Sequence, residues 1–325
     1  MKKFNVGILG LGGMGQMMHA DMSVHRKFSV SVVWDANKKV LEEHKISYPN
    51  VRIADSALDL INDPSIQLLY VATPPKFHCK YLTYAIEAKV PILCEKPLGI
   101  DLSESKEIVE LVKGSFLPNI INFNHGNSLA CLYVEKQLND GSLGNIFGVD
   151  TFIHLSQWPR EFQKKAKWLA GREQGGFTRE MLSHWLYLTR RLFGEGVILN
   201  SNITYPNDSV SSETRLLSDL DFDGIPMSII ACAGGKGPEG TEYTIWGEKK
   251  SFRFHSGGGL SVSVSDDWVD VFCQLDDIGV IDRQRGLDGV VSKLTGNLCQ
   301  MPNLSDGLAV QSIVETILGS RKPVK

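Results

Sequence analysis

The sequence predicts an α/β protein in two parts: a doubly wound parallel sheet, followed by an α+β domain with an open, mostly antiparallel sheet. Three observations support this prediction. Up to about residue 125, short apolar runs alternate with segments of helical spacing, which is the pattern of βαβ units. From residue 197 onward, strand-like runs follow one another with short turns. With 325 residues, the chain is long enough for two domains with substantial cores.

Five runs rich in Val, Ile and Leu are expected to form the parallel sheet. They are residues 4–9, 28–34, 67–73, 90–94 and 119–124. Asp55 and Ser56 can cap a short helix, and Asp101 with Glu104 three residues later has the spacing of a capping box. In the second part the expected strands are residues 145–153, 200–205, 214–222, 227–233, 242–246 and 251–254. A closing helix is expected over residues 306–323.

The first expected strand ends in Gly10-x-Gly12-x-x-Gly15, and a helical pattern follows. In this strand–turn–helix context the three glycines are typical of a dinucleotide-binding turn. Gly10 allows the tight turn, Gly12 lets a pyrophosphate approach the backbone, and Gly15 lets the helix pack close to the strand. An acidic residue that ends the second strand is expected at the adenosine ribose. The dinucleotide-binding residues predicted here are Gly10, Gly12, Gly13, Met14, Gly15 and Asp35.

Two further strand ends carry polar side chains, and ligands of such sheets bind beyond the carboxyl ends of the strands. The third run ends in Thr73 and Pro74, with His78 on the next helical turn. The fourth ends in Glu95 and Lys96, a charged pair that is costly after a buried strand unless it faces a cleft. Alternatives are an ordinary strand-to-helix turn and a surface ion pair.

Composition excludes several classes of function. The net charge is −3, so the chain has no general basic surface for nucleic acid or anionic membranes. No apolar run approaches the roughly 20 residues of a membrane span, and the start leaves no room for a signal peptide. Six scattered cysteines lack C-x-x-C spacing, so we expect reduced thiols, no metal site and a cytoplasmic location.

A segment of helical spacing in the second part follows a glycine pair and ends at Gly194. Glu180 and His184 are four residues apart, so they share one helix face, where a carboxylate can orient an imidazole. Arg179 is either an anion-binding group or a surface arginine. Upstream, Trp158 and Trp168 either wall a substrate pocket or belong to a core or interface.

Three ordered motifs give the chain a family resemblance. The glycine turn, Ala72-Thr73-Pro74-Pro75 with His78, and Glu95-Lys96-Pro97 together resemble the glucose–fructose oxidoreductase and inositol dehydrogenase (Gfo/Idh/MocA) family. The resemblance extends to the helix of residues 175–194 and covers nearly the whole chain. It implies a Rossmann domain and an α+β domain, bound NAD or NADP, and oxidoreduction at a carbinol or carbonyl carbon of a sugar, sugar derivative or cyclitol.

The resemblance also implies roles for individual residues. Lys96 matches the family's active-site lysine and His184 its histidine, and we expect both to act at the same carbon. Glu180 would support His184, and Asn124, Trp158, Trp168 and Arg179 are candidate substrate contacts. Thr73, Pro74, His78, Glu95 and Lys96 join the cofactor-binding set. Asp35 favours NAD because it would repel a 2′-phosphate, but Lys38 and Lys39 nearby leave NADP open.

This chain departs from the family at several positions. Glu180 stands where relatives have Asp, Leu182 where they have Gly, and Tyr187 where Asp is frequent. His125 stands where many relatives carry a basic residue. These changes leave open two alternatives: a dinucleotide-sensing regulator without turnover, and an imine or enone reductase.

The expected domain boundaries follow from the same patterns. Residues 1–122 form the cofactor domain, residues 123–302 the substrate and oligomerisation domain, and residues 303–325 a helix that returns to the first domain. The resemblance implies a homodimer or homotetramer that acts on a small polyhydroxylated substrate.

Overall fold

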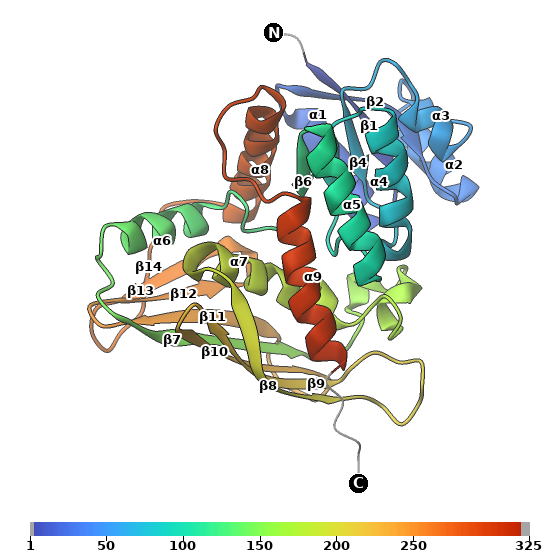
Figure 1. The fold of residues 1–325 in the computed structure, drawn as a ribbon. Coiled ribbons are helices and arrows are strands. Elements are labelled where there is room, and N and C mark those ends of the chain that lie inside the picture. The colour runs from blue at the N-terminus through green and yellow to red at the C-terminus, as the bar shows by residue number, and fades with distance from the viewer. Residues whose placement is uncertain (1–2, 320–325) are drawn as a thin grey trace. The chain divides into compact units, whose positions relative to one another are not determined.

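The fold is given by a computed structural model that describes residues 3–319 (Figure 1). The chain forms two compact units. Unit 1 runs up to Phe123 and also includes Arg283–Ala309, whereas unit 2 comprises Asn124–Asp282 and the chain from Val310 onward. Each unit has its own sheet.

Unit 1 contains a six-stranded, all-parallel sheet with the strand order β3-β2-β1-β4-β5-β6. This is the order of a doubly wound Rossmann sheet. Five of its strands had been predicted, and the short β3 was not, because two residues give no periodic signal. The strands are β1 Phe4–Leu9, β2 Phe28–Trp34, β3 Arg52–Ile53, β4 Leu68–Val71, β5 Ile92–Cys94 and β6 Asn119–Ile121.

Two helices of unit 1, α3 and α5, begin at the side-chain caps predicted from the sequence. Ser56 accepts a hydrogen bond from the amide of Asp59, and Asp101 accepts from those of Ser103 and Glu104. Each cap satisfies amides that the helix itself leaves unpaired. The helices are α1 Gly13–Val24, α2 Lys38–Ser47, α3 Ala57–Ile61, η1 Pro75–Phe77, α4 His78–Glu87 and α5 Leu102–Ser115.

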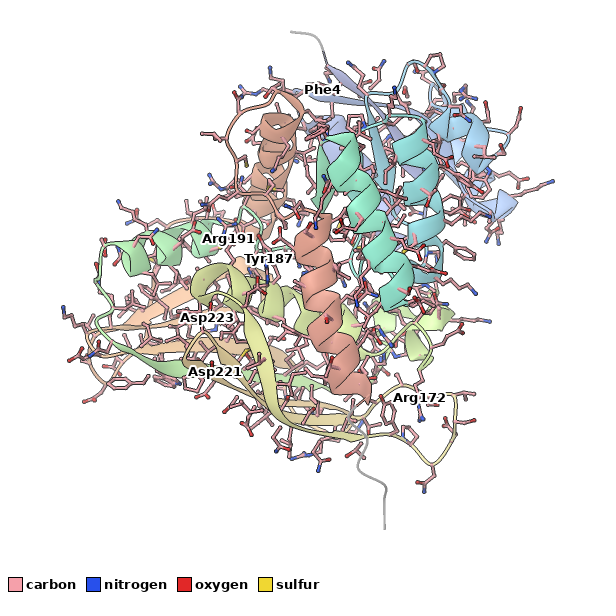
Figure 2. All side chains as sticks on the ribbon, in the orientation of Figure 1. Phe4, Arg172, Tyr187, Arg191, Asp221 and Asp223 are labelled. Carbon is pink, nitrogen blue, oxygen red and sulfur yellow. The ribbon has the colours of Figure 1, made fainter. Side chains whose placement is uncertain are left out.

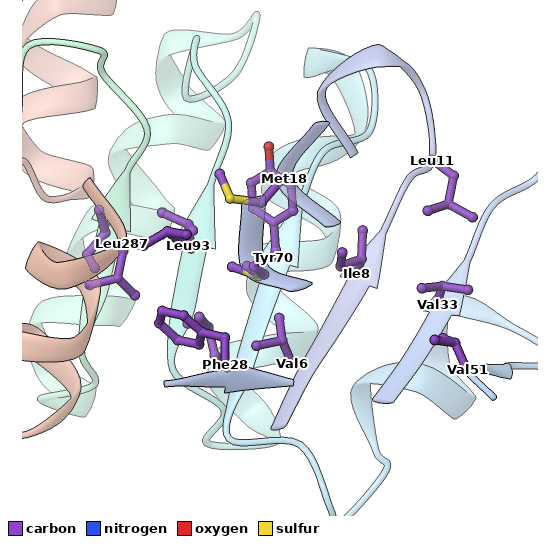
Figure 3. Close-up of a cluster of buried hydrophobic side chains, with 14 of the residues drawn as sticks. Val6, Ile8, Leu11, Met18, Phe28, Val33, Val51, Tyr70, Leu93 and Leu287 are labelled. Atoms are coloured by element: carbon purple, nitrogen blue, oxygen red, sulfur yellow. The ribbon is translucent and has the colours of Figure 1, made fainter. Parts of the chain in front are cut away.

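One face of this sheet carries a continuous apolar core (Figure 3). Val6 and Ile8 of β1 and Tyr70 of β4 pack there with Met18 of α1. Leu287, far along the chain on helix α8 (Ile278–Leu294), completes the same cluster (Figure 3). The first and last thirds of the sequence therefore share a core.

Unit 2 contains an eight-stranded sheet with the order β14-β13-β12-β11-β7-β10-β9-β8. Only the β7–β10 pair is parallel, as expected for a mostly antiparallel sheet. The strands are β7 Ile146–Leu155, β8 Gly196–Thr204, β9 Arg215–Phe222, β10 Ile225–Ala233, β11 Gly240–Gly247, β12 Ser251–His255, β13 Leu260–Ser263 and β14 Val269–Asp270.

Helix α7 (Ser183–Phe193) packs on one face of that sheet. Trp185 stacks on Tyr243 of β11 with ring centroids 5.2 Å apart, and the hydroxyls of Thr189 and Tyr243 are 3.0 Å apart. The other face leaves apolar side chains exposed. The remaining short elements are α6 Leu129–Asn139, η2 Glu161–Gln163, η3 Lys167–Ala170, the π-helical turn η4 Thr178–Leu182, and η5 Ser256–Gly258.

Helices α8 and α9 (Leu304–Gly319) each contribute residues to both compact units. Residues 283–302 belong to unit 1 and not to the second domain, because Leu287 and Val290 are buried against the strands of unit 1. The amide of Ile121 also donates to the carbonyl of Pro302, over 3.0 Å. The expected extension of the last helix over residues 320–323 lies outside the described residues.

Within residues 3–319, no helix combines the length and the apolar composition that crossing a lipid bilayer requires.

A buried histidine pair joins α1 to α2. Nδ1 of His19 and Nε2 of His44 are 3.1 Å apart, and the His19 ring stacks on Tyr48 with centroids 3.8 Å apart. Burial, and to a lesser extent the neighbouring imidazole of His44, lower the pKa of His19 to about 4. Burial also lowers the pKa of His44. The native pair is therefore neutral at pH 7.

This pair predicts acid sensitivity of the fold. His19 binds a proton in the unfolded chain near pH 6.5 but resists it in the native state down to about 4. The contribution of neutral His19 to the free energy of unfolding is about 3 kcal/mol. It is complete above pH 6.5 and is lost as the pH falls toward 4. Urea unfolding followed by circular dichroism at pH 7 and 4.5 should show a smaller loss of stability for His19→Gln than for wild type.

Ser23→Ala is the matched control, because it removes a hydrogen bond to the His19 carbonyl without removing a titrating group. It should keep the wild-type dependence on pH. If His19→Gln lost as much stability as wild type between pH 7 and 4.5, the buried histidine pair would not be the cause of the acid sensitivity.

Candidate cofactor and active site

The motif residues of unit 1 stand immediately beyond the carboxyl ends of the parallel strands. Hydrogen bonds continue the sheet one residue past each strand and fix these positions. They join Gly10 N to Trp34 O, Ala72 N to Leu9 O, Glu95 N to Val71 O and Asn122 N to Cys94 O, at 2.8–2.9 Å. This is the edge where doubly wound sheets bind ligands.

The glycine turn has the geometry that a pyrophosphate requires. Gly10 has φ +100°, and a Cβ there would lie 2.6 Å from the Ala72 carbonyl oxygen. A Cβ at Gly15 would lie 1.9 Å from the Gly10 oxygen, so the close packing of helix and strand excludes any side chain. Gly12 and Gly13, in contrast, are exposed and face open space. No side chain caps α1, so its first amides are available to an anion.

Asp35 ties the end of β2 to this turn. Its Oδ2 accepts from the Leu11 amide over 2.7 Å, and its Oδ1 accepts from the Asn37 amide over 2.8 Å. Each carboxylate oxygen has a further lone pair for a ribose hydroxyl. Lys38 and Lys39 are exposed on the first turn of α2. Asp35 therefore holds the turn in shape in addition to its predicted contact with the cofactor.

Thr73 and His78 differ in what they offer a ligand. The Thr73 hydroxyl is buried and makes no hydrogen bond with the described residues, which suits a cofactor contact. His78 is fully buried, with Nε2 2.7 Å from the Thr73 carbonyl oxygen and Nδ1 2.9 Å from that of Pro97. Its ring leaves no exposed edge, so we assign it the role of joining two loops rather than touching the cofactor.

Glu95 is the centre of a buried network at the end of β5. Its Oε1 accepts from the Tyr70 hydroxyl over 2.5 Å and from the Asn122 amide group over 2.6 Å. Burial, and then the Glu95 charge, raise the pKa of Tyr70 well above its usual value, so Tyr70 stays protonated and donates. Lys96 follows directly and is 8% exposed. The network fixes the backbone from which Lys96 projects.

In unit 2, the candidate histidine is held by the chain that follows β6. The amide of Asn124 donates to Nδ1 of His184 over 3.3 Å, which places the proton of the neutral imidazole on Nε2. Arg191, which is labelled in Figure 2, lies two turns along α7. It donates to the Gly126 carbonyl and pairs with Glu135 at 3.0 Å. Helix α7 therefore forms hydrogen bonds with the loop of residues 124–126 at two positions, His184 and Arg191.

Glu180 lies on the π-helical turn η4, just before α7 begins. Its Oε1 accepts from Gln163 over 3.2 Å, and Gln163 in turn accepts from Arg160 over 2.9 Å. Burial lowers the pKa of Arg160, and Glu180 opposes that shift. The carboxylate is thus oriented by a polar chain that starts in the loop after β7.

The remaining substrate candidates differ in their burial and in the hydrogen bonds that they make. Arg179 is 7% exposed and forms a two-bond ion pair with Glu315, at 2.6 and 2.8 Å, so it is a buried structural group and not an anion-binding side chain. The Trp158 indole N–H donates to the Leu169 carbonyl over 2.9 Å and is also used structurally. Trp168 is half-buried, and Asn124 is exposed. Both remain candidates.

The departures from the family pattern fall mostly in the core. Leu182 is fully buried and Tyr187 is 3% exposed, so both pack on the inner side of the helix. His125 is enclosed by aromatic rings, 4.6 Å from that of Trp185. Burial lowers its pKa to about 4, so it is neutral and does not replace the basic residue of relatives.

Several supporting residues carried no signal in the sequence. Tyr70 looked like an ordinary strand residue, and Gln163 and Glu315 lie in segments without a motif. Asn122 follows β6 directly, and its position at a strand end could have identified it. Among residues 3–319, no group of three or more His, Cys, Asp or Glu side chains is arranged to hold a metal ion.

Comparison with known proteins matches both parts of the chain. Residues 4–117 match the oxidoreductase family with an NAD-binding Rossmann fold, and residues 135–324 match the C-terminal alpha/beta domain of the same family. Levoglucosan dehydrogenase of Pseudarthrobacter phenanthrenivorans is 26% identical over 257 residues, which are 74% of this chain and 62% of that enzyme. Less than two thirds of that relative is therefore covered.

Two further similarities agree with this match. The scyllo-inositol 2-dehydrogenase (NADP(+)) of Bacillus subtilis is 26% identical over 256 residues, 76% of this chain and 67% of that enzyme. A solved levoglucosan dehydrogenase in complex with NADH and levoglucosan has the same fold, with a TM-score of 0.85, 21% identity, and coverage of 98% of this chain and 97% of that one. The chain belongs to the Gfo/Idh/MocA oxidoreductase family.

Proposed function

We propose that the protein is an NAD(P)-dependent dehydrogenase or reductase. It transfers hydride between nicotinamide and a carbinol or carbonyl carbon of a sugar, sugar derivative or cyclitol. The observation that carries this proposal is the edge of the unit 1 sheet. This edge carries the open glycine turn, the Asp35 carboxylate and the Thr73 hydroxyl, which has no hydrogen-bond partner among the described residues. It also carries the buried Glu95 network and, directly after it, Lys96.

The residues of unit 1 fit a dinucleotide. The first amides of α1 would hold the pyrophosphate and Asp35 the adenosine ribose, while Thr73, Pro74 and Lys96 would contact the rest of the cofactor. When bound, the nicotinamide supplies a carbon that accepts or gives hydride. NAD is favoured over NADP because a 2′-phosphate would meet the Asp35 charge.

Lys96 and His184 are assigned different parts of the proton chemistry. The Lys96 amine takes the hydroxyl proton when the substrate is oxidised and returns it when the carbonyl is reduced. While Asn124 occupies Nδ1, the Nε2–H of His184 donates a hydrogen bond to a substrate oxygen. Glu180, oriented by Gln163, supports His184 electrostatically.

The substrate class rests on the donors and acceptors of unit 2 and on the relatives. Arg160, Gln163 and Glu180 offer donors and acceptors together, the mixture that hydroxyl groups need. Relatives are named for levoglucosan and scyllo-inositol, both polyhydroxylated rings. A cytoplasmic location suits an enzyme of this kind and its six free cysteines.

Replacing Lys96 tests the chemistry. Lys96→Ala should lower kcat by at least about a hundredfold, since it removes the proton carrier, and leave the NAD dissociation constant nearly unchanged. His184→Ala should also lower kcat. If the two residues serve one oxygen, the fall in kcat of the double variant should be much smaller than the product of the falls in the two single variants. Nicotinamide absorbance with cyclitols and sugars is the assay.

Lys106→Ala, an exposed lysine of α5, is the control and should behave as wild type. Wild-type turnover in Lys96→Ala would end the assignment of its role. NAD binding without turnover of any polyol by the wild-type protein would instead favour a dinucleotide sensor.

Asp35 predicts the choice of cofactor. Asp35→Ser should weaken NAD binding and improve NADP binding relative to it, because the repelling charge is removed while Lys38 and Lys39 remain. Dissociation constants for both cofactors by titration calorimetry measure the change. Tighter binding of NADP than NAD by the wild-type protein would contradict this interpretation of Asp35.

We further propose that the open face of the unit 2 sheet forms a homodimer or homotetramer interface. Phe152, Ile230 and Leu217 stand side by side on three neighbouring strands, each between 39% and 47% exposed. Val197, Leu199 and Trp246 add apolar surface on β8 and β11. Exposed apolar rows of this kind usually mark interaction surfaces.

A charge at the centre of this row should prevent assembly. Ile230→Asp is expected to shift the sedimentation coefficient to that of a monomer, because a carboxylate would be desolvated in the interface. Leu111→Asp, an equally exposed position on α5, is the control and should leave assembly intact. A monomeric wild-type protein would exclude the interface.

A further inference from the structure

A buried carboxylate that the chemistry above does not use lies beneath the helix that carries His184. Glu213 precedes β9 and is 2% exposed. Its Oε1 accepts from the Thr178 amide over 2.7 Å. Thr178 is the first residue of η4, so this bond satisfies an amide that the helix start leaves unpaired.

The segment that carries Glu213 is firmly docked. Gly171 and Ser211 form an antiparallel bridge, the Arg172 amide donates to the Val210 carbonyl over 2.7 Å, and Ser212 donates to Ala170 over 2.9 Å. The carboxylate therefore approaches η4 from a fixed backbone and not from a mobile loop.

The glycine pair before η4 is shaped around this contact. Gly176 has φ +101°, and a Cβ there would lie 2.3 Å from Oε2 and 2.6 Å from Oε1 of Glu213. A Cβ at Gly175 would lie 2.3 Å from the Leu169 carbonyl oxygen. Gly176 is thus required both by its backbone conformation and by the space that the carboxylate occupies.

The charge of Glu213 is balanced locally. Arg179 lies near it and pairs with Glu315. Burial raises the pKa of Glu213, while the hydrogen bond from Thr178 and the Arg179 charge lower it. A carboxylate at the start of a helix also interacts favourably with the positive end of the helix dipole.

We propose that Glu213 is a positioning residue that fixes the start of the η4–α7 helix and thereby sets the placement of Glu180 and His184. The inference rests on the proposed role of His184 in the reaction. Glu213 itself touches neither substrate nor cofactor in this role. It acts through the Thr178 amide, two residues before Glu180 and six before His184.

The test combines hydrogen exchange with kinetics. In Glu213→Ala, peptides covering residues 175–186 should take up deuterium faster than in wild type, because the helix start loses its acceptor. The kcat should fall about 10- to 100-fold, the usual consequence of a small misplacement of catalytic groups, with the NAD dissociation constant unchanged. Glu213→Gln retains an amide oxygen for Thr178 and should recover most of the loss.

Glu248→Gln is the matched control, because Glu248 also accepts a backbone amide from a distant segment, that of Asn145 over 3.1 Å. It should change neither readout. The inference would be overturned if Glu213→Ala took up deuterium over residues 175–186 at the wild-type rate. It would also be overturned if the kcat of Glu213→Ala equalled that of the control. If wild-type protein turns over no polyol, the proposed function fails while the exchange comparison still decides the role of Glu213.

Discussion

The row of backbone hydrogen bonds beyond the strands of unit 1 is the constraint on which the cofactor edge depends. It fixes Gly10, Ala72, Glu95 and Asn122 to neighbouring strands before any ligand is present. A parallel sheet brings all its carboxyl ends to one edge, so residues distant in sequence become neighbours there. The side chains then add connections across the row, from Asp35 to Leu11 and from His78 to two loops.

Unit 2 positions its histidine in a different way. The η4–α7 helix that carries His184 has no side-chain cap of its own, and carboxylates from distant segments supply the contacts instead. Glu213 contacts the start of η4, and Glu315 binds Arg179 on the same turn. The far end of α7 is tied through Arg191 to Glu135. Removing one partner of a buried ion pair is strongly destabilising, because it leaves an uncompensated charge in the interior.

The features that the sequence predicted are those that a local pattern of residues determines. Two strands, Phe4–Leu9 and Phe28–Trp34, were predicted to the residue, because an apolar run between polar or glycine neighbours has clear ends. Helix α8 and strands β13 and β14 were missed, since their apolar spacing is weak and tertiary contacts hold them in place. Glycine roles followed from a motif, but the burial of Arg179 depends on Glu315, 136 residues away, and no local pattern reveals such a partner.

The late entry of α8 into the core of unit 1 bears on how the chain folds during synthesis. The Rossmann strands leave the ribosome first, yet Leu287, Val290 and Met301, which complete their core, are made after nearly all of unit 2. Until then the part of the apolar core that these three residues cover stays open to water and to other chains. A fragment that stops at Phe123 would keep that part exposed permanently and would be prone to aggregation.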